Sequence, residues 1–102
     1  MGKNSVMKSL GKCVGNVALH KILTRHTNRP ESIQHLRDEI RDYGEDSAEK
    51  ARCFNWNDEE KAKIRERAIK IAENDLIKNY PDVKFNKDEV IGLVDETMQE
   101  VF

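Results

Sequence analysis

Apolar residues recur at intervals of three and four along most of this sequence, and nowhere do they alternate with polar residues between turn signals. The first spacing places apolar side chains on one face of an α-helix, whereas alternation would indicate a half-buried strand. The pattern therefore predicts an all-α protein. At 102 residues the chain has room for one hydrophobic core. We expect a single domain over residues 1–102, a compact bundle of four to five helices in antiparallel packing with short links.

The N-terminal segment allows two interpretations. Residues 5–27 have helical periodicity, but their apolar face rotates after Val17, and Gly11 and Gly15 interrupt it. Each glycine costs about 1 kcal/mol relative to alanine inside a helix. We expect either two short helices that meet near Gly15 or one helix that changes its packing partner along its length. The two glycines also permit a close helix crossing or a kink.

The next helix has a start and a stop signal. Asn28, with Glu31 three residues later and Pro30 between them, predicts a capped helix start. Gly44 is placed to end this helix in the left-handed conformation. We then expect a short helical segment over residues 46–54.

Two capping boxes predict the remaining helices. Asn57 with Glu60 begins the longest one, which runs to Tyr80 before Pro81. Asn86 with Glu89 begins the last one. The apolar face of the last helix consists of Val90, Ile91, Val94, Met98, Val101 and Phe102.

Other features bear on the compartment. No apolar run approaches the roughly 20 residues that cross a bilayer, and polar residues interrupt every candidate signal sequence in residues 1–30. Cys13 and Cys53 lie far apart and form no Cys-x-x-Cys motif, so we expect both to stay reduced. The sequence predicts a cytoplasmic protein without membrane contact.

No motif indicates catalysis. His20, His26 and His35 share the N-terminal third with Cys13 but lack the local pairing that holds zinc. The serines form no Gly-x-Ser-x-Gly turn, and the segment from Gly11 to Gly15 lacks the spacing of a phosphate-binding loop. We therefore expect a non-enzymatic protein with no catalytic residue, metal, cofactor or small-molecule substrate.

The charge is unevenly distributed. The whole chain has a formal net charge of −1, but residues 1–30 contain six cations and no acid, which leaves −7 on residues 31–102. Four more cations, Lys63, Arg67, Lys70 and Lys78, share the polar face of the long helix. A basic stripe of this kind neutralises phosphates in nucleic-acid-binding proteins. Trp56 would stack on a base if it were exposed.

Each of these features is also consistent with a purely structural role. Glu59 with Lys63 and Glu66 with Lys70 are ordinary helical ion pairs. The N-terminal cations would complement the acidic remainder of the chain or of a second subunit, and Trp56 would belong to the core.

Two functions follow from these patterns. The first is a protein-interaction or self-association module, in which surplus apolar surface on the last two helices binds a partner protein or a second copy in a homo-oligomer. Its candidate interface is Val94, Met98, Val101 and Phe102. The alternative is a nucleic-acid-binding protein, with the candidate residues Lys8, Lys12, Lys21, Arg25, Arg29, Lys63, Arg67, Lys70 and Lys78.

Overall fold

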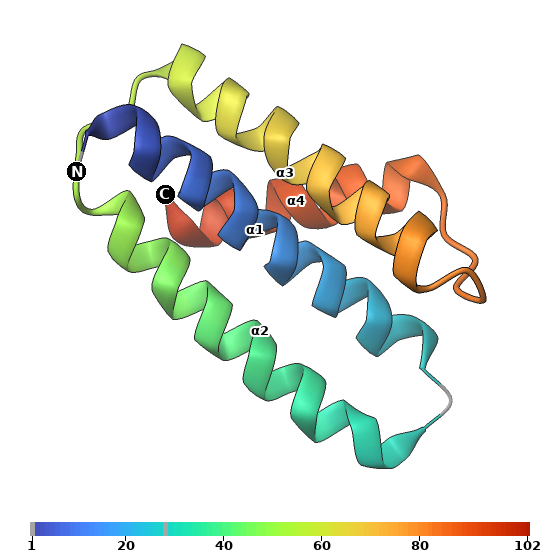
Figure 1. Cartoon of the computed structure of the whole chain (residues 1–102). Coiled ribbons are helices and arrows are strands. Elements are labelled where there is room, and N and C mark those ends of the chain that lie inside the picture. Colours follow the sequence, from blue (N-terminus) through green and yellow to red (C-terminus); the bar gives the residue numbers. More distant parts are fainter. Residues whose placement is uncertain (1, 28) are drawn as a thin grey trace.

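A computed structural model describes residues 2–27 and 29–102. These residues form a compact globule of four helices without any strand, namely α1 (Lys3–His26), α2 (Pro30–Ala51), α3 (Asp58–Asn79) and α4 (Lys87–Val101) (Figure 1). The prediction of an all-α bundle is confirmed. α1 is continuous through Gly11 and Gly15, so a single N-terminal helix with changing partners is the correct alternative.

α1 occupies the middle of the molecule. It lies between α2 and α3, and α4 covers the side that is distant from the viewer in Figure 1. Within the described residues, α2 and α3 both contact α1 and α4 but not each other. The link between α2 and α3 passes the start of α1, where the Lys3 ammonium donates to the Asn55 carbonyl oxygen (2.8 Å) and pairs with the Glu60 carboxylate (2.9 Å). These contacts join the start of α1 to the link and to the first turn of α3.

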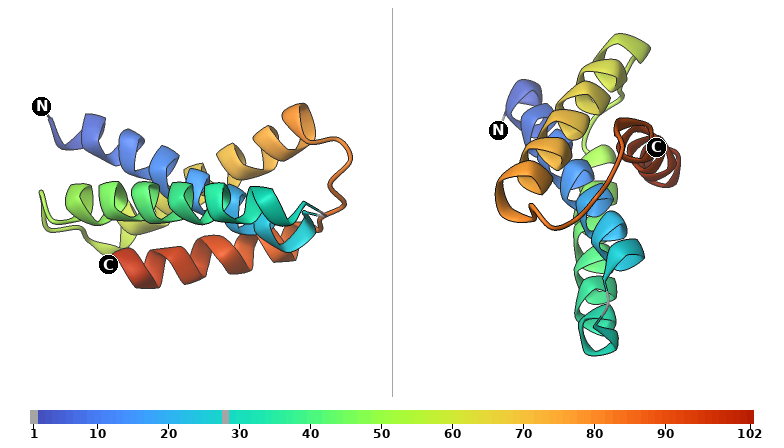
Figure 2. Two further views of the ribbon diagram at one scale, coloured as in Figure 1. Left: turned by 90° about the horizontal axis from the view of Figure 1, so that it is seen from below. Right: turned by 90° about the vertical axis from the view of Figure 1, so that its right-hand side faces the viewer.

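Two glycines allow α1 and α3 to approach closely where they cross, as the left view of Figure 2 shows. A Cβ atom on Gly15 would lie 3.0 Å from the Ala68 carbonyl oxygen, and one on Gly11 would lie 2.8 Å from Cδ of Arg67. A methyl group at Gly15 would crowd the backbone of α3, and one at Gly11 would require the Arg67 side chain to shift. The expected close helix crossing is therefore present, and it joins α1 to α3.

The core is built around α1 and α3. Every fourth residue of α3 over four helical turns is fully buried, and α4 contributes a shorter apolar face. α3 contacts both α1 and α4. None of the described helices combines the length and the hydropathy that crossing a bilayer requires. The fully buried apolar side chains are Leu10, Val14, Ala18, Ile22, Ile64, Ala68, Ala72, Leu76, Val90 and Val94.

The prediction that Gly44 ends a helix is wrong, because α2 continues through it to Ala51. A glycine stop requires positive φ, and no described glycine has it. Ser47 is fully buried one turn later, and its hydroxyl donates to the Tyr43 carbonyl oxygen (2.7 Å). Tertiary packing of α2 on α1 thus outweighs the propensity cost of one glycine, about 1 kcal/mol. The segment expected over 46–54 is the end of α2 and its link.

The predicted caps are formed to different degrees. At Asn57 both halves of the capping box with Glu60 are present. At Asn86 the side chain accepts from the Glu89 backbone N–H (2.8 Å), but the Glu89 carboxylate contacts His26 instead of returning to the cap. The predicted cap at Asn28 lies outside the described residues. α2 has Pro30 in its first turn, as the sequence predicts.

A pair of glycine substitutions tests the continuity of α2 and the α1–α3 crossing. Gly44→Ala adds a methyl group where nothing lies within 4 Å, so it is expected to raise the free energy of unfolding by about 0.5–1 kcal/mol. Gly15→Ala places the same group against the backbone of α3 and is expected to lower it by about 1 kcal/mol or more. Urea denaturation measures both. Destabilisation by Gly44→Ala would contradict the continuous helix.

Candidate nucleic-acid interface

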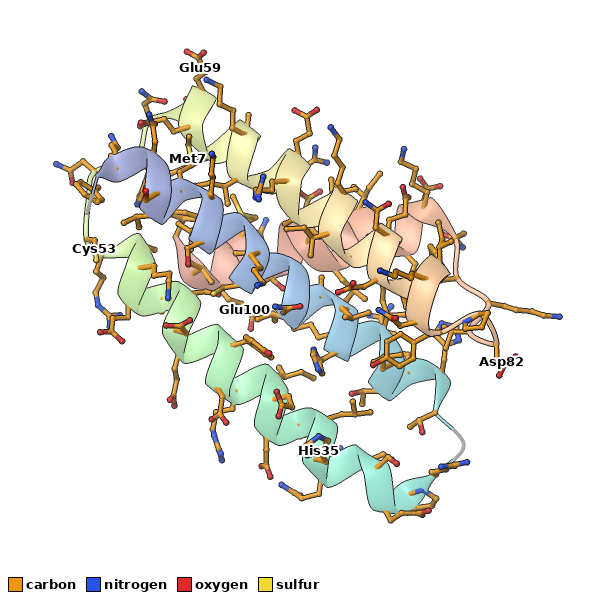
Figure 3. The ribbon with its side chains drawn as sticks, viewed as in Figure 1. Met7, His35, Cys53, Glu59, Asp82 and Glu100 are labelled. Carbon is orange, nitrogen blue, oxygen red and sulfur yellow. The ribbon has the colours of Figure 1, made fainter. Side chains whose placement is uncertain are left out.

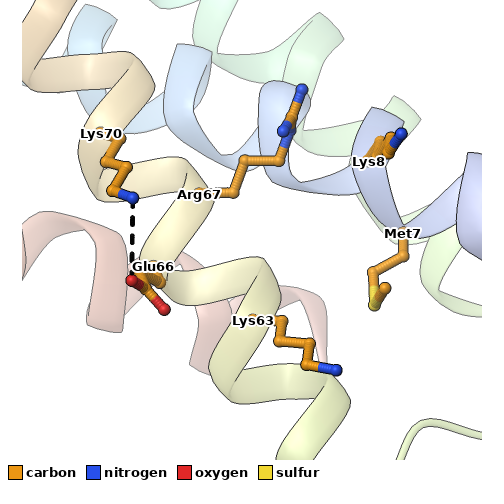
Figure 4. A pocket seen from close by; sticks show the side chains of 6 residues that line it. All are labelled: Met7, Lys8, Lys63, Glu66, Arg67 and Lys70. Atoms are coloured by element: carbon orange, nitrogen blue, oxygen red, sulfur yellow. Dashed lines mark ion pairs between the residues drawn. The ribbon is translucent and has the colours of Figure 1, made fainter.

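A shallow cationic groove lies between α1 and α3. Its volume is about 330 Å³. It contains four cations and one acid, so the formal charge of its lining is +3. Figure 4 shows the six lining residues, which are Met7, Lys8, Lys63, Glu66, Arg67 and Lys70.

The helix crossing positions the cations of this groove. Lys63, Arg67 and Lys70 follow one another at spacings of four and three residues, which places them on one face of α3. The alkyl chain of Arg67 lies directly over Gly11 of α1. Lys8 lies one turn before this glycine on the same helix. Because Gly11 has no side chain, the Arg67 side chain extends over α1. It thereby brings the cationic face of α3 near Lys8 (Figure 4).

Local ion pairs neutralise this groove only weakly. Lys63 pairs with Glu59 at 3.7 Å, and Lys70 pairs with Glu66 at 3.8 Å. All four side chains are more than 60% exposed, and such pairs contribute only about 0.3–0.5 kcal/mol. Lys8 and Arg67 have no ion-pair partner within 4.0 Å in the described part of the chain. The predicted helical pairs are thus formed, but they leave the groove positively charged.

Other cations of the predicted set are used inside the molecule. The Lys21 ammonium is bound on α4 by Glu96 (3.3 Å), Glu100 (2.5 Å) and the Thr97 hydroxyl (3.1 Å). Only 14% of its side chain is exposed. The Arg25 guanidinium pairs with Glu89 of α4 (3.5 Å). Both cations join α1 to α4. Lys21 is largely enclosed by its partners, whereas the Arg25 side chain remains 55% exposed beside Glu89.

The predicted set therefore separates into three groups. Lys8, Lys63, Arg67 and Lys70 come together in the groove, whereas Lys21 and Arg25 are docked. The remaining members are exposed but do not line the groove, and these are Lys12, Arg29 and Lys78.

Trp56 is not available for base stacking. Its indole N–H donates to the Ala51 carbonyl oxygen (2.9 Å), the Lys3 ammonium lies over its ring at 5.2 Å, and Phe54 packs against its edge. It is half-buried against the core. Trp56 is therefore a core residue, which is the alternative to base stacking that the sequence allows. The lining of the groove includes no aromatic side chain.

The predicted protein interface is mostly covered within the chain. Val94 is fully buried, and Met98 and Val101 pack against the core. Only Phe102 is exposed, at 39% of its surface. The sequence predicts surplus apolar surface on the last two helices. Val94, Met98 and Val101 do not contribute to such a surface, because α1, α3 and α4 pack against one another. The large apolar side chains that remain exposed are Ile77, Tyr80 and Phe102.

The three histidines have separate surroundings. His20 Nδ1 lies 2.6 Å from the Asn16 carbonyl oxygen, His26 contacts Glu89 (3.1 Å), and His35 lies 3.9 Å from Glu39. Over residues 2–27 and 29–102, no three His, Cys, Asp or Glu side chains come together in a way that would hold a metal ion.

Cys13 forms a polar contact between α1 and α2. The residue is 7% exposed, and its thiol donates to Oδ2 of Asp46 (3.1 Å). The other oxygen of Asp46 accepts from the Lys50 ammonium (2.7 Å). Burial, reinforced by this hydrogen bond, raises the pKa of the Cys13 thiol to about 11. The donated bonds from Lys50 and Cys13 lower the pKa of Asp46. A thiol that keeps its proton is a poor nucleophile, so Cys13 has a structural role. Both cysteines are free.

In comparisons with known proteins, no family model, no curated protein and no solved structure matches this chain.

The buried thiol predicts a loss of stability at alkaline pH. Folded Cys13 keeps its proton up to about pH 11, whereas the unfolded thiol releases it near 9.0. Between these values the unfolded chain binds fewer protons, so the free energy of unfolding falls as the pH rises. Urea denaturation on both sides of pH 9 measures this fall. Cys13→Ala should reduce it, whereas Cys53→Ala, which changes an exposed thiol, should retain it. An equal fall in the wild type and in both variants would show that the Cys13 thiol does not cause it.

Proposed function

We propose that this protein is a non-enzymatic binding protein that holds the phosphate backbone of a nucleic acid in the cationic groove. The observation that supports this most directly is the convergence of Lys8 from α1 with Lys63, Arg67 and Lys70 from α3. More than fifty residues separate the two sets in the sequence. Only the helix crossing brings them together.

The composition of the groove favours recognition of phosphate over recognition of bases. Ammonium and guanidinium groups bind phosphate oxygens through charge-assisted hydrogen bonds. Phosphate contacts carry no direct sequence information, and sequence-tolerant stacking needs aromatic side chains. The groove lining has no aromatic residue. We therefore expect binding with little sequence preference and with a strong dependence on salt.

The acidic remainder of the chain supports a localised site. Exposed acids on α2, among them Asp42, Glu45 and Glu49, repel a polyanion from that flank. A nucleic acid would therefore approach from the α1–α3 side. The net charge of −1 is then the sum of a basic groove and an acidic remainder of the chain. It does not argue against a basic site.

The second candidate function is a protein-interaction or self-association module that binds a partner protein or a second copy. The observation that favours it is the exposed aromatic ring of Phe102 beside Val101. This is a smaller apolar surface than the sequence predicts, and therefore we place this function second.

Charge reversal within the groove tests the proposed function. The double variant Lys63→Glu/Lys70→Glu should weaken binding of a fluorescent single-stranded or duplex oligonucleotide about tenfold or more at low salt, because it removes two phosphate contacts and adds repulsion. It should also make the dependence of binding on salt less steep. Fluorescence anisotropy over a salt titration measures both effects.

Lys78→Glu is the matched control for the single variant Lys63→Glu, since it makes the same charge change on the same helix outside the groove. It should retain most of the affinity. If the wild-type protein has no affinity at low salt, or if the control variant loses as much affinity as Lys63→Glu, the proposed function is wrong.

A further inference from the structure

A second groove lies at the end of the bundle where both termini are found in the left view of Figure 2. The link between α2 and α3 meets the last turn of α4 there. We call it the end groove, and its volume is about 330 Å³. Its lining residues are Ala51, Arg52, Phe54, Asn55, Trp56, Lys61, Val101 and Phe102.

Aromatic side chains gather around this groove. Phe54, Trp56 and Phe102 line it, and they are half of the six aromatic residues in the chain. Trp56 is fixed by its hydrogen bond to Ala51 and by edge contact with Phe54, with ring centroids 5.7 Å apart. Phe102 is exposed beside them. Rigid aromatic side chains at a surface are typical anchor points of protein interfaces.

The charge of the end groove is positive. Arg52 is exposed, and the Lys61 ammonium lies 5.5 Å from the centre of the Phe102 ring. None of the eight lining residues has an acidic side chain. In the part of the chain that the structure describes, neither Arg52 nor Lys61 has a carboxylate within ion-pair distance, since Glu60 beside Lys61 pairs with Lys3. Two cations beside exposed aromatic surface are complementary to an acidic ligand with an apolar side chain.

We propose that the end groove binds a short acidic segment of a partner protein that carries one large apolar side chain. This side chain packs on Phe54 and Phe102, and the flanking carboxylates bind Arg52 and Lys61. A second copy of this chain fits less well, because a symmetric contact through this groove would bring Arg52 and Lys61 of one copy against the same cations of the other. A nucleic-acid backbone requires a longer row of cations than these two. The proposal does not depend on the function of the cationic groove.

The test uses a fluorescent peptide of Glu and Asp residues with a Phe-Leu pair at its centre. The full chain should bind it. Arg52→Glu and Lys61→Glu should each weaken binding by about tenfold, because each replaces a charge-assisted contact with repulsion. Phe102→Ala should weaken it severalfold. Lys61→Gln is a second variant that removes the charge without adding an acid beside the three in the first turn of α3, and it should weaken binding severalfold. Circular dichroism confirms folding of each variant.

Two controls show whether the peptide binds at the end groove itself. Lys84→Glu changes an exposed cation away from both grooves and should bind the peptide like the wild type. A peptide with Gly-Ser in place of Phe-Leu should bind much more weakly. The proposal is overturned if the original peptide does not bind, if the Gly-Ser peptide binds equally well, or if Lys84→Glu has the same effect as Arg52→Glu. It is also overturned if an oligonucleotide displaces the peptide, or if sedimentation shows a dimer that Phe102→Ala dissociates.

Discussion

The close crossing of α1 and α3 is the constraint on which the rest of this structure depends. At Gly15 the two helices approach until a methyl group would meet the backbone of α3, and at Gly11 the free space holds the alkyl chain of Arg67. This contact keeps α1 in the middle, where it packs against α2, α3 and α4 (Figures 1 and 2). A side chain at Gly15 would press on the backbone of α3, whereas one at Gly11 would displace the alkyl chain of Arg67.

The distribution of charge follows from this packing. The cations of the N-terminal helix divide according to the neighbour that each turn of the helix meets. Where α1 faces α4, Lys21 and Arg25 pair with acids of α4. Where α1 faces α3, Lys8 meets further cations. The stick view in Figure 3 shows charged side chains around the outside of all four helices. A nearly neutral chain thus contains one groove whose lining has a formal charge of +3.

The sequence predicted the features that depend on local chemistry. The caps at Asn57 and Asn86 form because each needs only a side chain and a backbone N–H three residues later. The prediction that Gly44 ends a helix is wrong because a glycine stop is a local signal. The continuation of α2 depends instead on packing around the buried Ser47. The partners of Lys21 lie 75 and 79 residues away, so no local pattern shows that it is docked. The sequence places Val94 and Phe102 on the same apolar helix face. Only the fold shows that Val94 is buried in the core whereas Phe102 is exposed. The sequence identified the four cations of the groove, but only the structure separates them from the other five candidates.

The most direct test of the central claim is an NMR titration of the isotope-labelled protein with a single-stranded oligonucleotide. Backbone amide shifts would be followed at low salt and again after salt is added. We expect the largest changes around Lys8 and Gly11 on α1 and around Lys63 to Lys70 on α3, and we expect them to diminish with salt, because phosphate contacts release counterions. Changes centred on Lys21 and Arg25, or no changes at all, would contradict the account.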